Sequence, residues 1–123
     1  MERDGATILV VEDDNDIRLL LRAVLEVEGY NVVEATTGRE ALEVGAKVQP
    51  QLILMDISLP LLDGLSATRL IKAEENLRDV PVVCVSAYDS ARRRAIQAGC
   101  AEFVVKPIEV EELKAIVARL VQP

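Results

Sequence analysis

Hydrophobic residues in the chain gather in five short runs, and an amphipathic segment follows each run. The run that ends at Asp56 is the clearest, because the uncharged stretch 51–55 leads directly into that acid. Pro60 cannot donate to a strand ladder, so the strand must end before it. A continuous apolar run of this length is typical of a strand buried on both faces of a parallel sheet. The same reasoning predicts further strands at 7–11, 31–35, 81–85 and 102–105.

Apolar side chains between these strands recur at helical spacing. The first helix is expected to end before Gly29 and the last to begin with an acidic first turn made by Glu109, Glu111 and Glu112. Both show apolar residues at i, i+3, i+4, i+7 and i+8, which predicts one buried face on each. These residues are Ile17, Leu20, Leu21, Val24 and Leu25 in the first helix, and Leu113, Ile116, Val117, Leu120 and Val121 in the last.

Three more helices follow from local signals. A capping box at 37–40 opens a helix that continues to about Val48. The Pro and Asp-Gly of 59–64 predict a turn, and 65–75 then reads as a helix. Its inner side is expected to carry Leu65, Thr68, Leu70 and Ile71. Asp89 or Ser90 is expected to cap a further helix that ends before Gly99.

Alternating strands and helices with short connections predict parallel strands joined by right-handed crossovers. Five such units are too few for an eight-fold barrel, so we expect an α/β fold with an open, doubly wound sheet and helices on both faces. The 123 residues contain no linker, repeat or low-complexity segment. They are therefore expected to form one domain, 1–123.

Composition narrows the classes of partner. Aromatic residues make up only 2% of a chain that is 50% hydrophobic, so the core is expected to be aliphatic. The net charge of −7 argues against binding to nucleic acid or to an anionic membrane surface. The basic run 92–94 is read most simply as a solvated helix face, with contact to a partner as the alternative.

The chain lacks histidine and has two cysteines, which argues against a structural zinc site. Cys84 lies inside an apolar run and is expected in the core, while a disulfide with Cys100 is left open. No apolar run approaches the roughly 18 residues of a membrane span, and the N-terminus lacks the core of a signal peptide. We therefore expect a cytoplasmic protein.

Charged and hydroxyl side chains follow the predicted strands. The carboxyl ends of parallel strands lie along one edge of a sheet, where ligands bind in such folds. That edge is expected to collect Glu12, Asp13, Asp14, Asp56, Ser86 and Lys106. Carboxylates this close repel one another, and a hard divalent cation such as Mg²⁺ relieves the repulsion. Carboxylates, a cation, a hydroxyl and a lysine together suit phosphoryl transfer, in which an Asp carboxylate can act as covalent acceptor.

Each of these residues also has a plainer interpretation. An acid after a strand is usually a turn residue or a helix cap, which is what we expect of Asp14 or Asn15. Asp13 and Asp56 end runs that should be buried, so function is favoured for both. Ser86 alone would be read as a turn residue and Lys106 as a solvated surface lysine. Their joint position beside Asp56 favours a functional role.

Five motifs occur at matching strand ends: LVVEDD (9–14), LMD (54–56), LPLLDG (59–64), VSA (85–87) and VKP (105–107). With these motifs the chain resembles the receiver domain of two-component response regulators along essentially its whole length. The resemblance implies a flavodoxin-like (βα)5 fold with strand order 2-1-3-4-5. It also implies a receiver without an output domain in this chain, either free-standing or part of a longer protein.

The resemblance implies specific roles for the acids. Asp56 would be the phosphoacceptor, taking a phosphoryl group from the phosphohistidine of a sensor histidine kinase or histidine phosphotransfer protein. Mg²⁺ (or Mn²⁺) would be held by Asp13 and Asp56 directly, by Glu12 through bound water, and by the backbone carbonyl of Ser58. Such a regulator is not an enzyme in the usual sense, because it catalyses only its own phosphotransfer and dephosphorylation.

Three further residues would bind the phosphoryl group or respond to its presence. Ser86 would donate its hydroxyl to one phosphoryl oxygen, and Lys106 would pair with another. Phe103 matches the aromatic switch position of the family, although a plain core role is also expected of it. The Lys106–Pro107 peptide would be cis. The surface of the fourth helix, fifth strand and fifth helix would then control a downstream protein, whose identity the sequence does not give. The resemblance also implies that two copies could form a homodimer through their last helices.

Three other functions compete with the phosphoacceptor switch. Phosphatases of the haloacid dehalogenase type also use an aspartyl phosphate, but they carry a second Asp two residues after the nucleophile, where this chain has Ser58. A flavin-binding module needs a hydroxyl-rich loop after the first strand, and this chain has acids there. A receiver-like scaffold that is never phosphorylated is disfavoured because all the acceptor-site residues are present.

Overall fold

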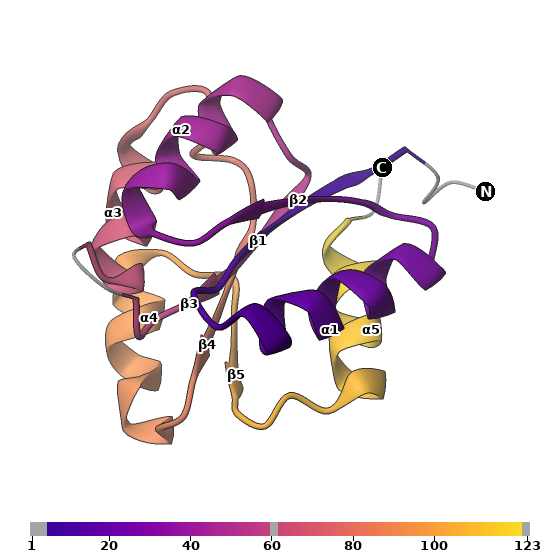
Figure 1. The fold of residues 1–123 in the computed structure, drawn as a ribbon. Helices are drawn as coiled ribbons and strands as arrows, with labels where there is room; N and C mark the ends of the chain where they lie inside the picture. Colours follow the sequence, from indigo (N-terminus) through magenta and orange to yellow (C-terminus); the bar gives the residue numbers. More distant parts are fainter. Residues whose placement is uncertain (1–4, 60–61, 122–123) are drawn as a thin grey trace.

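The computed structural model describes residues 5–59 and 62–121, and Figure 1 shows its fold. Pro60 and Leu61, part of the expected turn, lie outside the described residues. The elements are β1 (Thr7–Val11), α1 (Asn15–Val27), β2 (Asn31–Ala35), α2 (Gly38–Val48), β3 (Leu52–Asp56), α3 (Gly64–Ala73), β4 (Val82–Ser86), a 3₁₀ turn (Asp89–Ala91), α4 (Arg92–Ala98), β5 (Glu102–Val105) and α5 (Val110–Leu120).

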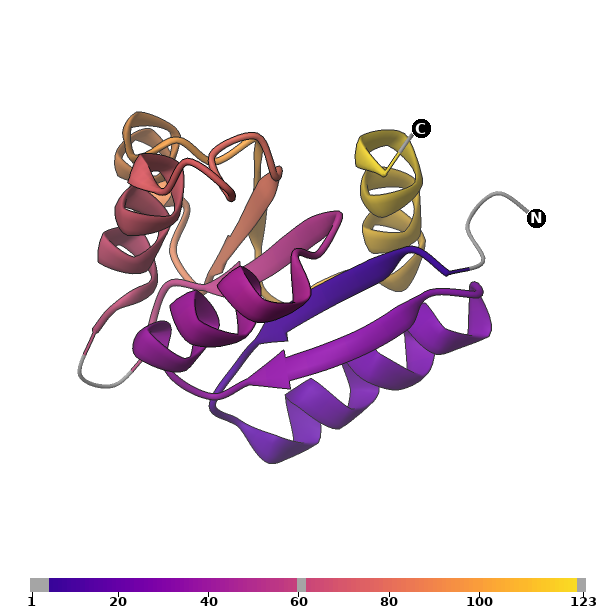
Figure 2. The same ribbon diagram turned by 90° about the horizontal axis from the view of Figure 1, so that it is seen from above.

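The five strands form one parallel sheet in the order β2-β1-β3-β4-β5, which confirms the predicted fold class. Helices α1 and α5 cover one face, while α2, α3 and α4 cover the other (Figures 1 and 2). Because successive strand residues point to opposite faces, the sheet separates two apolar cores. Leu9 and Ile53 belong to the core under α2, α3 and α4, whereas Ile8 and Leu52 belong to the core under α1 and α5.

Two central strands run one residue further than the sequence indicated. Asp56 is the last residue of β3 and pairs with Val85 of β4. Ser86 is the last residue of β4 and pairs with Val105 of β5. The backbones of both residues are therefore held by strand pairing, which fixes their positions more tightly than a loop would.

Helix capping agrees with the sequence at Asp14 and Thr37, and the structure adds a cap at Asp63 that the sequence analysis did not predict. Side chains of Asp14, Thr37 and Asp63 each accept a hydrogen bond from a backbone N–H of the first turn that they precede. The fourth helix is different. Neither Asp89 nor Ser90 caps it, because the chain first makes the 3₁₀ turn and the Asp89 carboxylate accepts hydrogen bonds from the Arg92 guanidinium instead.

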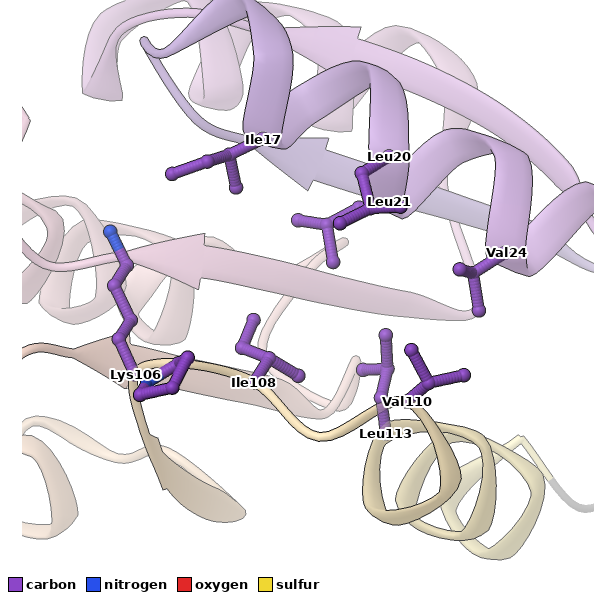
Figure 3. Close-up of a pocket in the computed structure, with 9 residues that line it drawn as sticks. Ile17, Leu20, Leu21, Val24, Lys106, Ile108, Val110 and Leu113 are labelled. Carbon is purple, nitrogen blue, oxygen red and sulfur yellow. The ribbon is translucent and has the colours of Figure 1, made fainter.

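Two residues assigned to buried helix faces are exposed. Leu20 on α1 is 58% exposed and Leu70 on α3 is 45% exposed. Leu20 lies at the rim of an apolar groove of about 400 Å³ between α1 and the start of α5, which Figure 3 shows with its lining residues. Within the described part of the chain, no helix has the length and apolarity needed to span a bilayer.

Candidate functional site

The carboxyl edge of the sheet brings together the strand-end residues that the sequence singled out. Carboxylate oxygens of Glu12, Asp13 and Asp56 all lie within 4.8 Å of one another. Glu12 and Asp56 are each 3% exposed and Ser86 is 2% exposed, whereas Asp13 is open to solvent. Buried acids are rare unless they are paired or face a cation, so this edge of the molecule is unlike an ordinary solvated surface.

Asp56 is held by one hydrogen bond and one ion pair at the end of β3. Its Oδ1 accepts a bond of 3.0 Å from the backbone N–H of Ser58, and its Oδ2 lies 3.3 Å from the Lys106 ammonium. The backbone continues in register, since the Ile57 N–H donates to the Val85 carbonyl at 2.9 Å. The carboxylate therefore has a fixed orientation.

Gly64 allows α3 to begin directly against this strand end. A Cβ atom at Gly64 would lie 2.2 Å from the Asp56 carbonyl oxygen, which no side chain tolerates. The Gly64 N–H donates to the Ile57 carbonyl at 3.0 Å, and Asp63 caps the helix at the same point. The sequence marked this Asp-Gly pair only as a turn, because the steric requirement comes from a strand elsewhere in the fold.

Glu12 has a strongly perturbed acidity. Burial, together with a smaller contribution from the nearby Asp56 carboxylate, raises the pKa of its carboxyl to about 7. The Asp14 N–H at 3.2 Å and the Lys106 ammonium at 3.7 Å act in the opposite direction. The two carboxylates of Glu12 and Asp56 thus share one nearby ammonium, that of Lys106, which compensates only part of their negative charge.

Lys106 reaches the acids from the end of β5. Its backbone N–H donates to the Ser86 carbonyl at 2.7 Å, and the Lys106–Pro107 peptide is cis, as the resemblance implied. Figure 3 shows its side chain at one end of the apolar groove, with the ammonium pointing away from Ile108 and Val110. The Ser86 hydroxyl accepts a bond of 3.0 Å from the Tyr88 N–H, so its own proton can be given to another acceptor.

Phe103 and Arg92 form a contact that the sequence did not indicate. The Phe103 ring is already buried, with 5% of its surface exposed, and the Arg92 guanidinium stacks over it at 4.8 Å from the ring centroid. Arg92 is exposed, as predicted for the basic run 92–94, and contact of this run with a partner stays a prediction. Its guanidinium also lies over the Phe103 ring and binds Asp89.

Arg18 is a further residue that the sequence analysis missed. Its guanidinium donates to the Glu12 backbone carbonyl at 2.9 Å and to the Glu34 carboxylate at 2.9 Å. It therefore fixes the backbone of the acidic loop from α1. No sequence signal identified it, because the sequence does not distinguish an arginine that contacts a neighbouring loop from an arginine on a solvated helix face.

The donor set fits a hard divalent cation. Mg²⁺ prefers oxygen ligands and takes one or two carboxylates together with water. Glu12, Asp13 and Asp56 offer such oxygens close together, and a cation bound there would favour the charged form of Glu12, whose pKa is raised chiefly by burial. The use of the Ser58 carbonyl as a ligand stays a prediction, since the structure gives only its N–H contact with Asp56.

Comparison with known proteins shows similarity to response regulator receiver domains over most of the chain. The sequence model of the response regulator receiver domain matches residues 8–118. A curated relative, the polar-differentiation response regulator DivK of Brucella ovis, is 38% identical over 106 residues, which cover 85% of this chain and 86% of DivK.

Solved structures are similar as well. The receiver domain of sensor histidine kinase PA1611 from Pseudomonas aeruginosa, with magnesium coordinated in its active site cleft, is 37% identical with a TM-score of 0.88, covering 95% of this chain and 98% of that one. The response regulator TrrA from Thermotoga maritima, in complex with Mg²⁺ and BeF, is 34% identical with a TM-score of 0.86, covering 94% and 98%.

Proposed function

The chain belongs to the response regulator receiver domain family, and on that premise we propose that it is a phosphoacceptor switch in which Asp56 is the acceptor. The phosphodonor would be the phosphohistidine of a sensor kinase or histidine phosphotransfer protein, and the switch would work in the cytoplasm as one domain, 1–123. The observation that carries this proposal is the Asp56 carboxylate, buried beside Glu12 and Asp13 and 3.3 Å from the Lys106 ammonium.

Each side chain has a distinct role in the transfer. An Asp56 carboxylate oxygen attacks phosphorus, the bond from phosphorus to the donor histidine nitrogen breaks, and the electron pair stays on the imidazole. The Ser58 N–H holds one Asp56 oxygen and so fixes the direction of the carboxylate. Lys106 and the Ser86 hydroxyl would then pair with phosphoryl oxygens, which carry the charge of the transition state.

A Mg²⁺ ion (or Mn²⁺) fits the acidic cluster and, when bound, would neutralise phosphoryl oxygens during transfer. Asp13, Asp56 and the Ser58 carbonyl would hold it directly, and Glu12 would hold it through water. The magnesium in the receiver domain of PA1611 and the Mg²⁺ with TrrA support this assignment by relationship. The protein would turn over only its own phosphoryl group, by transfer and by hydrolysis.

The signal would leave through the surface formed by α4, β5 and α5. Ser86 ends β4 and Phe103 lies in β5, so a phosphoryl group that draws the Ser86 hydroxyl inward acts directly on this part of the sheet. Because the Phe103 ring is already buried, we expect the change to pass through the Arg92 guanidinium that covers it. The two states would then bind a downstream protein with different affinity.

The test is labelling with acetyl phosphate in the presence and absence of Mg²⁺. The wild type and the exposed control Asp16→Asn should gain one base-labile phosphoryl group in a Mg²⁺-dependent reaction, measured by intact mass. Asp56→Asn should gain none, since the amide is a poor nucleophile. Equal stable labelling of Asp56→Asn would mean that another residue is the acceptor. An unlabelled wild type at saturating Mg²⁺ would favour a scaffold that is never phosphorylated.

A further inference from the structure

The peptide bond between Glu12 and Asp13 lies just beyond the paired part of β1. Strand pairing with β2 and β3 ends at Val11, and the Glu12 N–H still donates to the Ala35 carbonyl at 3.0 Å. Asp13 is exposed, yet its carboxylate is one of the three that lie close together at the carboxyl edge of the sheet. The position of this carboxylate therefore depends on the contacts that hold residues 12–14, the acidic loop, after the strand.

The Arg18 guanidinium makes such a contact from the first turn of α1. Its Nη1 donates to the Glu12 backbone carbonyl and its Nε to the Glu34 carboxylate on β2, both at 2.9 Å. Its Nη2 donates to the Asn15 side-chain oxygen at 2.6 Å. One planar group thus joins the end of β1, the edge strand β2 and the start of α1, and the side chain is only 15% exposed. Because the donor directions of a guanidinium are fixed, these three contacts together leave it little freedom.

The contact with the Glu12 carbonyl determines where Asp13 lies. This carbonyl belongs to the same peptide plane as the Asp13 N–H and Cα, so a bond that holds the oxygen also holds the atom that carries the Asp13 side chain. On the other side of Asp13, the Asp14 carboxylate caps α1 by accepting the Ile17 N–H at 3.0 Å, and the Asp14 N–H donates to the Glu12 carboxylate at 3.2 Å. Asp13 therefore lies between two fixed peptides, and Arg18 holds one of them.

The positive charge of Arg18 acts on a cation in the opposite direction. A guanidinium beside the acidic loop repels Mg²⁺, so a variant that loses only this charge should bind the ion more tightly. A variant that loses the support of the loop should bind it more weakly, because Mg²⁺ demands near-octahedral geometry from its ligands. The sign of the change in affinity therefore distinguishes a positioning residue from a mere charge.

We propose that Arg18 is a positioning residue for the Mg²⁺ site. Through the Glu12 carbonyl it holds Asp13 where its carboxylate meets the ion, and Glu34 keeps the guanidinium oriented. In this role Arg18 does not bind the ion itself, so its effect passes through the acidic loop. The inference rests on the Mg²⁺ ligation in the proposed function. Groups that orient metal ligands typically contribute roughly 10–100-fold to affinity, and a contact made through the backbone is expected at the lower end.

Arg22 is a matched control one turn further along α1. Its guanidinium pairs with the same Glu34 carboxylate and donates to the Val32 carbonyl at 3.1 Å. It carries the same charge as Arg18 and shares an anion with it, but the backbone carbonyl that it holds lies on β2. A comparison of the two arginines therefore isolates the contact with the Glu12 carbonyl.

The experiment titrates the metal-free full chain with Mg²⁺ at constant ionic strength and follows the backbone amides by heteronuclear NMR, which gives the Kd and shows whether each variant is folded. Arg18→Gln should bind Mg²⁺ about tenfold more weakly than wild type. Arg18→Lys keeps the charge but loses the planar fork, so it should also bind more weakly, by a smaller factor. Arg22→Gln should keep the wild-type Kd, and Asp13→Asn, which removes a ligand, should bind most weakly of all.

The outcomes separate this inference from the proposed function. A wild type whose amides do not respond to Mg²⁺ would overturn the metal ligation of the proposed function and this inference with it. A Kd of Arg18→Gln equal to or lower than that of wild type would overturn the positioning role alone. Equal weakening in Arg18→Gln and Arg22→Gln would also overturn it, because the shared pairing with Glu34 would then be the cause. If Arg18→Gln does not fold, Arg18→Lys decides, and a wild-type Kd in that variant would overturn the role.

Discussion

Gly64 is the residue on which the packing of α3 against the acceptor strand depends, because a Cβ there would lie 2.2 Å from the Asp56 carbonyl oxygen. We predict that Gly64→Ala lowers the free energy of unfolding by about 1–3 kcal/mol, the usual cost of overpacking a rigid neighbour. It should also slow labelling of Asp56, since α3 or β3 must shift. Urea unfolding and acetyl phosphate labelling measure the two effects.

Gly45 is a matched control within the same protein. It is a buried helical glycine in α2, but a Cβ there would meet only the ends of the Leu77 and Leu9 side chains, at 3.4 and 3.8 Å, which are ordinary contacts. Alanine is a better helix former than glycine, so Gly45→Ala should raise stability by about 0.5–1 kcal/mol. Equal effects of the two substitutions would mean that helix propensity, and not the contact with Asp56, determines the outcome at Gly64.

Glu12 should make the stability of the metal-free protein depend on pH. Burial and the Asp56 carboxylate raise its pKa in the folded state to about 7, from an ordinary value of 4.5. Between these values the folded protein binds more protons than the unfolded chain, so the Glu12 contribution is fully present below pH 4.5 and is lost as the pH rises through 7. Urea unfolding between pH 4.5 and 8 should show this fall in wild type.

The variant Glu12→Gln removes the titration and keeps the shape of the side chain. Its unfolding free energy should vary less over the same pH range than that of wild type. A wild type and variant with parallel pH profiles would show that Glu12 is ionised in the folded protein throughout, with Lys106 compensating its charge.

Single residues of the site were predictable where a strand ends, and not where the fold brings a distant segment in. Asp56, Ser86 and Lys106 follow apolar runs, and parallel strands bring such positions to one edge of the sheet. Arg18 supports the Glu12 backbone from a helix turn, and Arg92 covers Phe103 from another helix. Neither contact leaves a local pattern, because both depend on how helices lie on the sheet.

At the level of the element, α3 is held in place by a cap next to the acceptor strand. The Asp63 carboxylate accepts the Ser66 N–H at 2.9 Å, and this bond lowers the pKa of the carboxyl below its usual range. We predict that Asp63→Ala costs about 0.5–2 kcal/mol of unfolding free energy at pH 7, while Asp63→Asn, which caps as well, costs little. Thermal or urea unfolding of both variants measures this.

The pH dependence of the cap has the opposite sign to that of Glu12. Because the folded pKa of Asp63 is depressed, its contribution is present above pH 3.8 and is lost as the pH falls through the folded value. The difference in stability between wild type and Asp63→Ala should therefore shrink in acid. A difference that stays constant down to the folded pKa would mean that the alanine variant acts through the turn and not through the carboxylate.

Elements with strong local signals were predicted almost to the residue, and α4 shows where that reasoning fails. Its start looked like a cap at Asp89 or Ser90, but the polar groups there are used by a 3₁₀ turn and by the Arg92 side chain. Helical periodicity likewise placed Leu20 and Leu70 inside. Periodicity gives the direction of the apolar face, whereas its width depends on how far the neighbouring helix covers it.

For the whole molecule, the order of the strands could not be derived from the residues alone. The position of β1 between β2 and β3 pairs segments that are far apart in sequence, and apolar runs carry no information on which run lies beside which. The resemblance to receiver domains supplied that order. The order has a chemical consequence, because it brings β1 and β3 side by side and thereby joins Glu12 and Asp13 to Asp56.

This convergence of acids in a chain of net charge −7 predicts that Mg²⁺ stabilises the whole fold. A ligand that binds only the folded state at 100 times its Kd adds about 2.7 kcal/mol of unfolding free energy. Urea unfolding at constant ionic strength, with Mg²⁺ against Na⁺, should show an increase of this order, and EDTA should reverse it.

Asp13→Asn should lose most of the increase, while Asp16→Asn, which removes the same charge from the outside of α1, should keep it. Equal loss in both variants would mean that Mg²⁺ acts through general charge screening, because only a site that holds the ion between specific oxygens distinguishes two exposed acids three residues apart.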